Sequence, residues 1–174
     1  MSSNKGTALR KIAQGGLLVA VALVLSLIEK MFPLQAVVPI PGIKLGLANV
    51  VTVFALTMLG TRAALSILLC RVTLASIFMG SMTGFLFSLF GGLLALLVMW
   101  LLLRQEGRWF SMIGVSIGGA AAHNIGQIGA AMLTLGTLDV AGYLPLLLLS
   151  AIPMGFVTGL TASAVIGHLK KIRF

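Results

Sequence analysis

The chain has 174 residues, of which 59% are hydrophobic and 9% are charged, and its mean hydropathy is +1.15. Soluble domains are about 45–50% apolar and about 25% charged, so a water-soluble fold is excluded and an integral membrane protein is expected. The net charge of +9 does not indicate nucleic acid binding, because the basic residues are divided among short segments between apolar runs, where they orient a membrane protein.

Apolar runs fill most of the chain and predict an all-α fold with six transmembrane helices in a single domain over residues 1–174. A span needs about 20 mostly apolar residues, and Gly, Pro or a charged residue follows each run. The first run is longer than the apolar core of a signal peptide, so we expect an uncleaved helix there. The six predicted spans are Ile12–Phe32, Lys44–Leu59, Ala63–Met79, Thr83–Leu103, Met112–Leu135 and Tyr143–Leu169.

The distribution of basic residues predicts that both termini are cytoplasmic. In that orientation nine Lys and Arg residues lie in inner segments, and only Lys30 and Lys44 lie in outer ones. An excess of Lys and Arg on the cytoplasmic side is the usual arrangement. We therefore expect a multi-pass protein of the cytoplasmic membrane that is surrounded by lipid. The outer connection 33–43 contains three prolines and is either a stiff lid or a simple connector.

Small residues recur every four positions in three of the predicted helices. Residues four apart share a helix face, and a stripe of small side chains lets two helices approach closely within a membrane. The pattern therefore predicts tight packing among the last three helices. The stripes are Gly84, Ser88 and Gly92; Gly114, Gly118, Ala122, Gly126 and Ala130; and Gly155, Gly159, Ser163 and Gly167.

Polar residues inside the apolar runs are the candidates for a binding site, because such residues are costly in a membrane unless they are paired or line a cavity. The topology places Arg71 near mid-membrane and the others in the outer half. Arg71 carries a planar fork suited to carboxylate or phosphate, and Lys44 is expected at a helix N-terminus that favours anions. We expect an outward-facing pocket for an anionic or strongly hydrogen-bonding ligand. Its predicted ligand-binding residues are Lys44, Asn49, Arg71, His123, Asn124 and Gln127.

A structural role for the same residues stays open. Arg71 either binds a ligand or pairs with Glu29 or backbone carbonyls. His123 is either a ligand contact or a histidine satisfied between helices, and Asn124 and Gln127 are either ligand contacts or interhelical hydrogen-bonding groups.

The chain lacks the motifs of self-contained catalysis. Its three acidic residues, Glu29, Glu106 and Asp139, are far apart, so a paired-carboxylate site for Mg²⁺ and diphosphate is not encoded. Neither a Walker A segment nor a nucleophile elbow is present. His123 and His168 fall at different depths, which does not support a zinc or haem site. We expect no catalytic residues, no metal site and no intrinsic cofactor, with any ATP hydrolysis on a separate chain.

Four segments carry a resemblance to a known family: Pro41–Asn49 (PGIKLGLAN), Arg71 in its apolar helix, Phe87–Gly92 (FSLFGG) and Gly114–Gln127 (GVSIGGAAAHNIGQ). Together they resemble the bacterial membrane family called heptaprenyl diphosphate synthase component I, or the Gx transporter family, over essentially the whole chain. That family is similar to the substrate-binding S-components of energy-coupling-factor (ECF) vitamin transporters, which are six-helix proteins working with a coupling subunit and ATPases. The S-component AxxxA motif is replaced here by Gly16–Ala20.

The resemblance leaves two functional hypotheses. In the first, the chain is an S-component-like protein of the bacterial cytoplasmic (inner) membrane. It binds a vitamin, flavin or isoprenoid/quinone-like ligand from outside for uptake with ECF partners, which would supply ATP. In the second, it is a non-catalytic subunit in heptaprenyl diphosphate, menaquinone or flavin-linked metabolism. It would then recruit a prenyl synthase or flavoprotein through the basic segments Arg104–Arg108 and Lys170–Arg173.

Overall fold

The computed structural model describes residues 2–31, 39, 43–105 and 109–172, and this part of the chain contains helices and no strand. The all-α prediction is therefore confirmed. The expected lid over residues 33–43 falls almost entirely outside the described residues. The helices are α1 (Ser2–Lys30), α2 (Asn49–Met58), α3 (Thr61–Met79), α4 (Met82–Leu103), α5 (Met112–Leu135), the 3₁₀ helix η2 (Asp139–Tyr143) and α6 (Leu144–Ile172).

Four segments of the described chain are long and apolar enough to cross a membrane: Lys11–Glu29, Thr61–Phe78, Met82–Leu103 and Asp139–Lys171. Many large apolar side chains on these segments are exposed, such as Leu17 on α1 and Phe78 on α3, as a lipid-facing surface requires. α5 is long enough, with 24 residues, but its polar residues and glycines make it less apolar. Four candidate spans fit a membrane protein, and the count of six stays a prediction.

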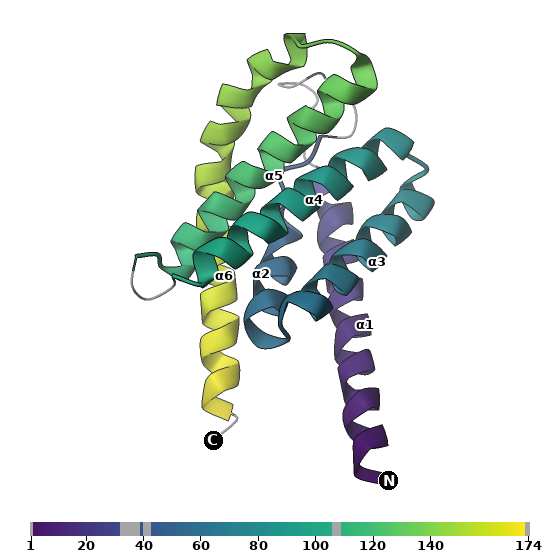
Figure 1. Ribbon diagram of the computed structural model, residues 1–174, viewed down its shortest axis with the longest axis vertical. Coiled ribbons are helices and arrows are strands. Elements are labelled where there is room, and N and C mark those ends of the chain that lie inside the picture. The colour runs from purple at the N-terminus through teal and green to yellow at the C-terminus, as the bar shows by residue number, and fades with distance from the viewer. Residues whose placement is uncertain (1, 32–38, 40–42, 106–108, 173–174) are drawn as a thin grey trace.

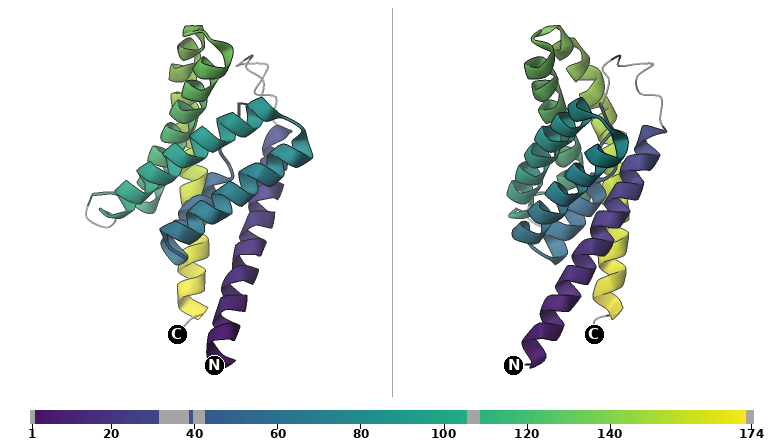
Figure 2. Two further views of the ribbon diagram at one scale, coloured as in Figure 1. Left: turned by 45° about the vertical axis from the view of Figure 1, so that its right-hand side comes forward. Right: turned by 90° about the vertical axis from the view of Figure 1, so that its right-hand side faces the viewer.

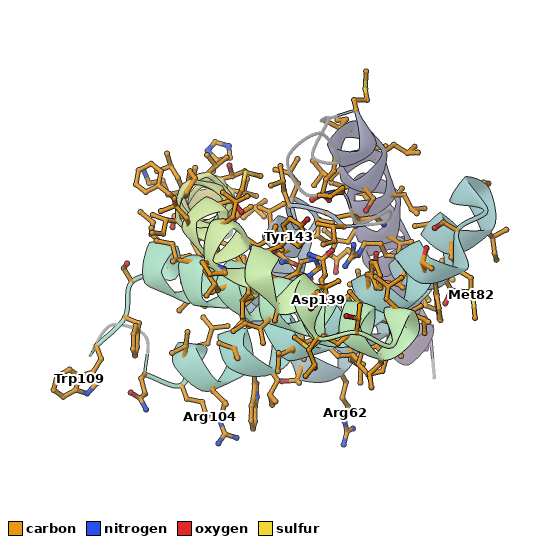
Figure 3. All side chains as sticks on the ribbon, turned by 90° about the horizontal axis from the view of Figure 1, so that it is seen from above. Arg62, Met82, Arg104, Trp109, Asp139 and Tyr143 are labelled. Carbon is orange, nitrogen blue, oxygen red and sulfur yellow. The ribbon has the colours of Figure 1, made fainter. Side chains whose placement is uncertain are left out.

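Several helix ends lie toward two opposite ends of the molecule (Figure 1). The start of α1 and the end of α6 lie at the same end of the molecule, and the α2–α3 turn faces that end too (Figure 1). η2 and the α3–α4 turn lie toward the opposite end (Figure 1). Seen from the η2 end, Asp139 and Tyr143 lie over the middle of the bundle, while Arg62, Arg104 and Trp109 project from its periphery (Figure 3).

Local sequence sets several of these ends. Gly80 adopts a left-handed conformation at the C-cap of α3, with φ of +62°. The side chain of Ser81 then accepts a hydrogen bond of 3.0 Å from the N–H of Gly84 and caps α4. In the same way, Ser111 caps α5 by accepting from the N–H of Gly114. The Gly–Ser pair produces the tight turn that lays α4 beside α3 (Figure 2).

The predicted second span was wrong at its start. α2 begins at Asn49, and the preceding residues from Lys44 are not α-helical. Gly46 has φ of +86°, a conformation that side chains disfavour and that interrupts a right-handed helix. The ten residues of α2 extend only about 15 Å, which is about half of a hydrocarbon core. Lys44 therefore does not lie at the helix N-terminus, as the sequence had led us to expect.

The last three helices pack through small residues, as the stripes predicted, but only some of the striped positions take part. α5 lies between α4 and α6 and packs extensively on both. A Cβ added at Gly126 would lie 2.7 Å from the Cα of Gly91 on α4. A Cβ added at Gly155 on α6 would lie 2.3 Å from the Cα of Ile117 on α5. Gly167, in contrast, has open space around it.

Candidate functional site

A buried polar cluster lies where α1 to α5 meet the irregular segment Lys44–Ala48. Non-helical backbone at membrane depth is tolerated where it is enclosed by protein or lines a cavity, and this segment is enclosed by polar side chains. Every member of the cluster is buried except Lys44, which is half-buried. The members are Ser26, Glu29, Lys44, Asn49, Arg71, Ser88, His123, Asn124 and Gln127. The structure thus brings together all six residues that the sequence predicted.

Gln127 fixes the start of the irregular segment. Its Oε1 accepts a 2.8 Å hydrogen bond from the N–H of Lys44, and its Nε2 donates a 2.8 Å bond to the carbonyl of Lys44. Nε2 also lies 3.4 Å from Oδ1 of Asn124. The amide of Gln127 therefore replaces the helical hydrogen bonds that the interrupted backbone lacks.

Glu29 fixes the middle of the same segment. Oε1 of its carboxylate accepts hydrogen bonds from the N–H groups of Gly46 and Leu47, the second at 3.3 Å. Its side chain is 3% exposed and interacts electrostatically with Lys44 and Arg71. A buried carboxylate needs such partners, so α1 and the start of α2 are joined through this side chain.

The Lys44 side chain points into the cluster. Its Nζ donates a 2.9 Å hydrogen bond to Oγ of Ser88 on α4. Ser88 belongs to a predicted packing stripe, and the structure gives it this second role. The ammonium group is thereby held near Glu29, with which it also interacts.

Arg71 lies on α3 and is buried, with 4% of the residue exposed. Nη1 lies 3.5 Å from Oγ of Ser26, a long hydrogen bond, and Nη2 has no hydrogen-bond partner among the described residues. Arg71 interacts electrostatically with Glu29, yet the described residues show no direct ion pair between the two. The alternative in which Glu29 pairs directly with Arg71 is therefore not what the structure shows.

Asn49 and His123 both lie close to Gly46, on the side where a Cβ would stand. A Cβ added at Gly46 would be 2.8 Å from Nδ2 of Asn49 and 3.1 Å from Cδ2 of His123, so only glycine leaves room for both. Neither polar atom of the Asn49 amide, and neither ring nitrogen of His123, makes a hydrogen bond of regular geometry within the described chain. Buried groups of this kind normally have partners, and leaving one unpaired costs about 1–3 kcal/mol.

Asn124 has a structural partner on α6. Its Nδ2 donates a 2.5 Å hydrogen bond to the carbonyl of Leu147. Asn124 and Gln127 thus both act as interhelical groups, which was one of their two predicted roles. The ligand-binding role of the six predicted residues stays a proposal.

Three members of the cluster, Ser26, Glu29 and Ser88, were not among the ligand-binding residues predicted from the sequence. Ser26 and Glu29 are three apart on α1 and share a face, and Glu29 is the sole acidic residue of the first apolar run. That isolation is a signal, because an acid within a predicted span needs a partner. Nothing in the sequence indicates that the partners are the N–H groups of Gly46 and Leu47.

The family model described as heptaprenyl diphosphate synthase component I matches residues 18–165. The chain belongs to this family. The match covers most of the 174 residues and includes the whole polar cluster. Neither a curated protein nor a solved structure matches the chain, so its similarity to ECF S-components stays a prediction.

Proposed function

We propose that the chain is a membrane protein that binds a small anionic ligand in the buried polar cluster and passes it to partner subunits for uptake. The observation that carries the proposal is a set of incompletely paired polar groups from three helices. Within the described chain, the Asn49 amide on α2 and Nη2 of Arg71 on α3 have no hydrogen-bond partner, and the His123 ring on α5 has only an interaction with the backbone of Gly91 that falls short of regular geometry. A ligand that pairs with them would remove the cost of leaving them buried and unsatisfied.

The charges of the cluster favour an anion. Arg71 and Lys44 contribute +2 and Glu29 contributes −1, so the formal charge of the cluster is +1. Arg71 supplies a fork that fits carboxylate or phosphate. The non-helical segment Lys44–Ala48 supports the same proposal, because transporters commonly bind substrates beside unwound backbone within the membrane.

A partner subunit within the membrane would have an apolar surface on which to dock. α1 and α6 stand apart on either side of α2, and a groove of about 240 Å³ lies between them. Gly16 and Ala20, which stand where S-components carry AxxxA, are both exposed on α1. Residues from α1, α2 and α6 line the groove: Leu18, Val21, Val50, Val51, Phe54, Thr161, Ala162 and Val165.

The test is to identify what the purified protein carries and whether cells need the protein to acquire it. Protein purified in mild detergent is denatured, and the released small molecules are identified by mass spectrometry against a mock purification. We expect a stoichiometric anionic compound, and we expect cells lacking the chain to accumulate less of it from the medium. A protein that carries no such compound at stoichiometric amounts would contradict the proposal.

A second candidate function rests on family membership. The family description names the chain as one component of heptaprenyl diphosphate synthase, so it would act as the membrane partner of another synthase subunit. Exposed basic residues near the C-terminal ends of α4 and α6 would provide the contact: Arg104, stacked 3.7 Å above the Trp100 ring, with Lys170 and Lys171. Co-purification of a synthase subunit that is lost on changing these three residues to Glu would favour this function.

A further inference from the structure

We propose that the position of the Glu29 carboxylate is itself an anion subsite, which Glu29 occupies in the unliganded protein and which the anionic group of the ligand takes on binding. The inference rests on the proposed function, since it names where the ligand's charge sits. It also assigns a role to a buried acid that the proposed site does not otherwise use.

The donors around Glu29 are those of an anion site. Its carboxylate accepts from two successive backbone N–H groups, those of Gly46 and Leu47, immediately before α2 begins at Asn49. Successive backbone N–H groups in a non-helical turn can form a concave site that favours negative charge. Arg71 and Lys44, two cations from other parts of the chain, interact electrostatically with the same carboxylate.

A second observation is that the subsite contains a hydrogen-bond donor without a partner in the described chain. The guanidinium of Arg71 is buried beside the carboxylate, and its Nη2 has no partner in the described chain. It does not form a direct ion pair with Glu29, and its Nη1 instead reaches Ser26, three residues earlier on α1. The Glu29 carboxylate therefore accepts hydrogen bonds from the backbone N–H groups of Gly46 and Leu47, but it leaves Nη2 of Arg71 without a hydrogen-bond partner in the described chain. A ligand carboxylate or phosphate can accept hydrogen bonds from these backbone N–H groups and from the guanidinium of Arg71.

The exchange has a mechanical consequence. Glu29 is the link between the end of α1 and the irregular segment Lys44–Ala48. An anion that replaces the carboxylate at Gly46 and Leu47 releases α1 from that segment. Ligand binding is thereby coupled to the position of α1, the helix that also lines the apolar groove.

The test replaces the side chain and supplies its carboxylate in solution. Glu29→Ala removes the carboxylate and leaves room for formate, which carries the same group. Unfolding midpoints are measured in detergent at constant ionic strength with formate or chloride as the anion. We expect a saturable rise with formate in Glu29→Ala. We expect no such rise in wild type, in Glu29→Gln (where the amide fills the space) or in Glu29→Ala/Arg71→Gln (where the fork is gone).

If Glu29→Ala does not yield folded protein in chloride, the same comparison is made on the yield of monodisperse protein purified with formate or with chloride. A yield that formate restores supports the subsite. Equal behaviour in formate and chloride overturns it, and the proposed function is then judged separately by whether wild type carries an anionic compound.

A competition experiment tests whether the ligand uses the subsite. In Glu29→Ala the co-purified compound should lose occupancy in native mass spectra as formate is added, with chloride as the control. Rescue by formate without competition would show a structural anion site that the ligand does not enter, and the exchange would be rejected.

Discussion

The side-chain amide of Gln127 pairs with the backbone of Lys44 through two hydrogen bonds of 2.8 Å, across 83 positions of sequence. This pairing takes the place of helical hydrogen bonds in a segment that the second helix does not include. It also sets where the residues from Lys44 to Asn49 stand against α5, and so it shapes the candidate site.

Gln127→Leu removes both bonds and leaves the N–H and the carbonyl of Lys44 without these partners. Leaving a buried group unpaired costs about 1–3 kcal/mol, so we expect a loss of about 2–4 kcal/mol in the free energy of unfolding. Denaturant unfolding in detergent measures it. Gln14→Leu, at an exposed position of α1, is the matched control and should change stability by less than about 0.5 kcal/mol. Equal effects of the two changes would show that the pairing contributes nothing.

Substitutions of two asparagines should affect ligand binding and folding stability differently. Asn124 donates to the carbonyl of Leu147, so Asn124→Leu should destabilise the protein by about 1–3 kcal/mol. Asn49 has no partner in the described chain, so Asn49→Leu should be neutral or stabilising while ligand binding falls. The measurements are unfolding midpoints and ligand occupancy for both variants. A destabilised Asn49→Leu protein would mean that its amide has a structural partner after all.

Arg71 provides the main charge of the proposed site. Truncating one partner of a buried charged pair costs about 2–5 kcal/mol, so Arg71→Ala should weaken ligand binding by that amount. Arg71→Lys should restore only part of the loss, because an ammonium lacks the planar fork. Arg62→Ala, at an exposed position on the same helix, is the control. Binding isotherms with unchanged affinity in a folded Arg71→Ala protein would remove Arg71 from the site.

The packing of α6 on α5 predicts opposite effects of two Gly→Ala changes. A Cβ at Gly155 would lie 2.3 Å from the Cα of Ile117, so Gly155→Ala forces the helices apart and should cost about 1–3 kcal/mol. Gly167 has nothing within 4 Å, so Gly167→Ala should stabilise the helix by about 0.5–1 kcal/mol. Thermal unfolding of the two variants gives the comparison, and equal shifts would argue against close helix contact at Gly155.

The sequence predicted the helices better than the contacts. α5 has the predicted bounds, Met112–Leu135, because Ser111 and Gly136 mark its ends. The start of α2 was missed because the run from Lys44 is apolar, and nothing in it reveals that Gly46 takes a positive φ. The depths of Arg71 and His123 in the predicted spans were enough to predict that the two residues lie in one cluster. The partners of Glu29 depend on that irregular backbone and were therefore beyond sequence reasoning.

Native mass spectrometry of wild type beside Asn49→Leu is the most direct test of ligand binding by the cluster, because the Asn49 amide has no hydrogen-bond partner in the described chain whose loss would unfold the protein. We expect a small anionic compound to be bound to wild type and strongly depleted in an Asn49→Leu variant of equal or greater stability. The same occupancy in both proteins, or a wild-type chain that carries no small molecule, would contradict ligand binding by the cluster.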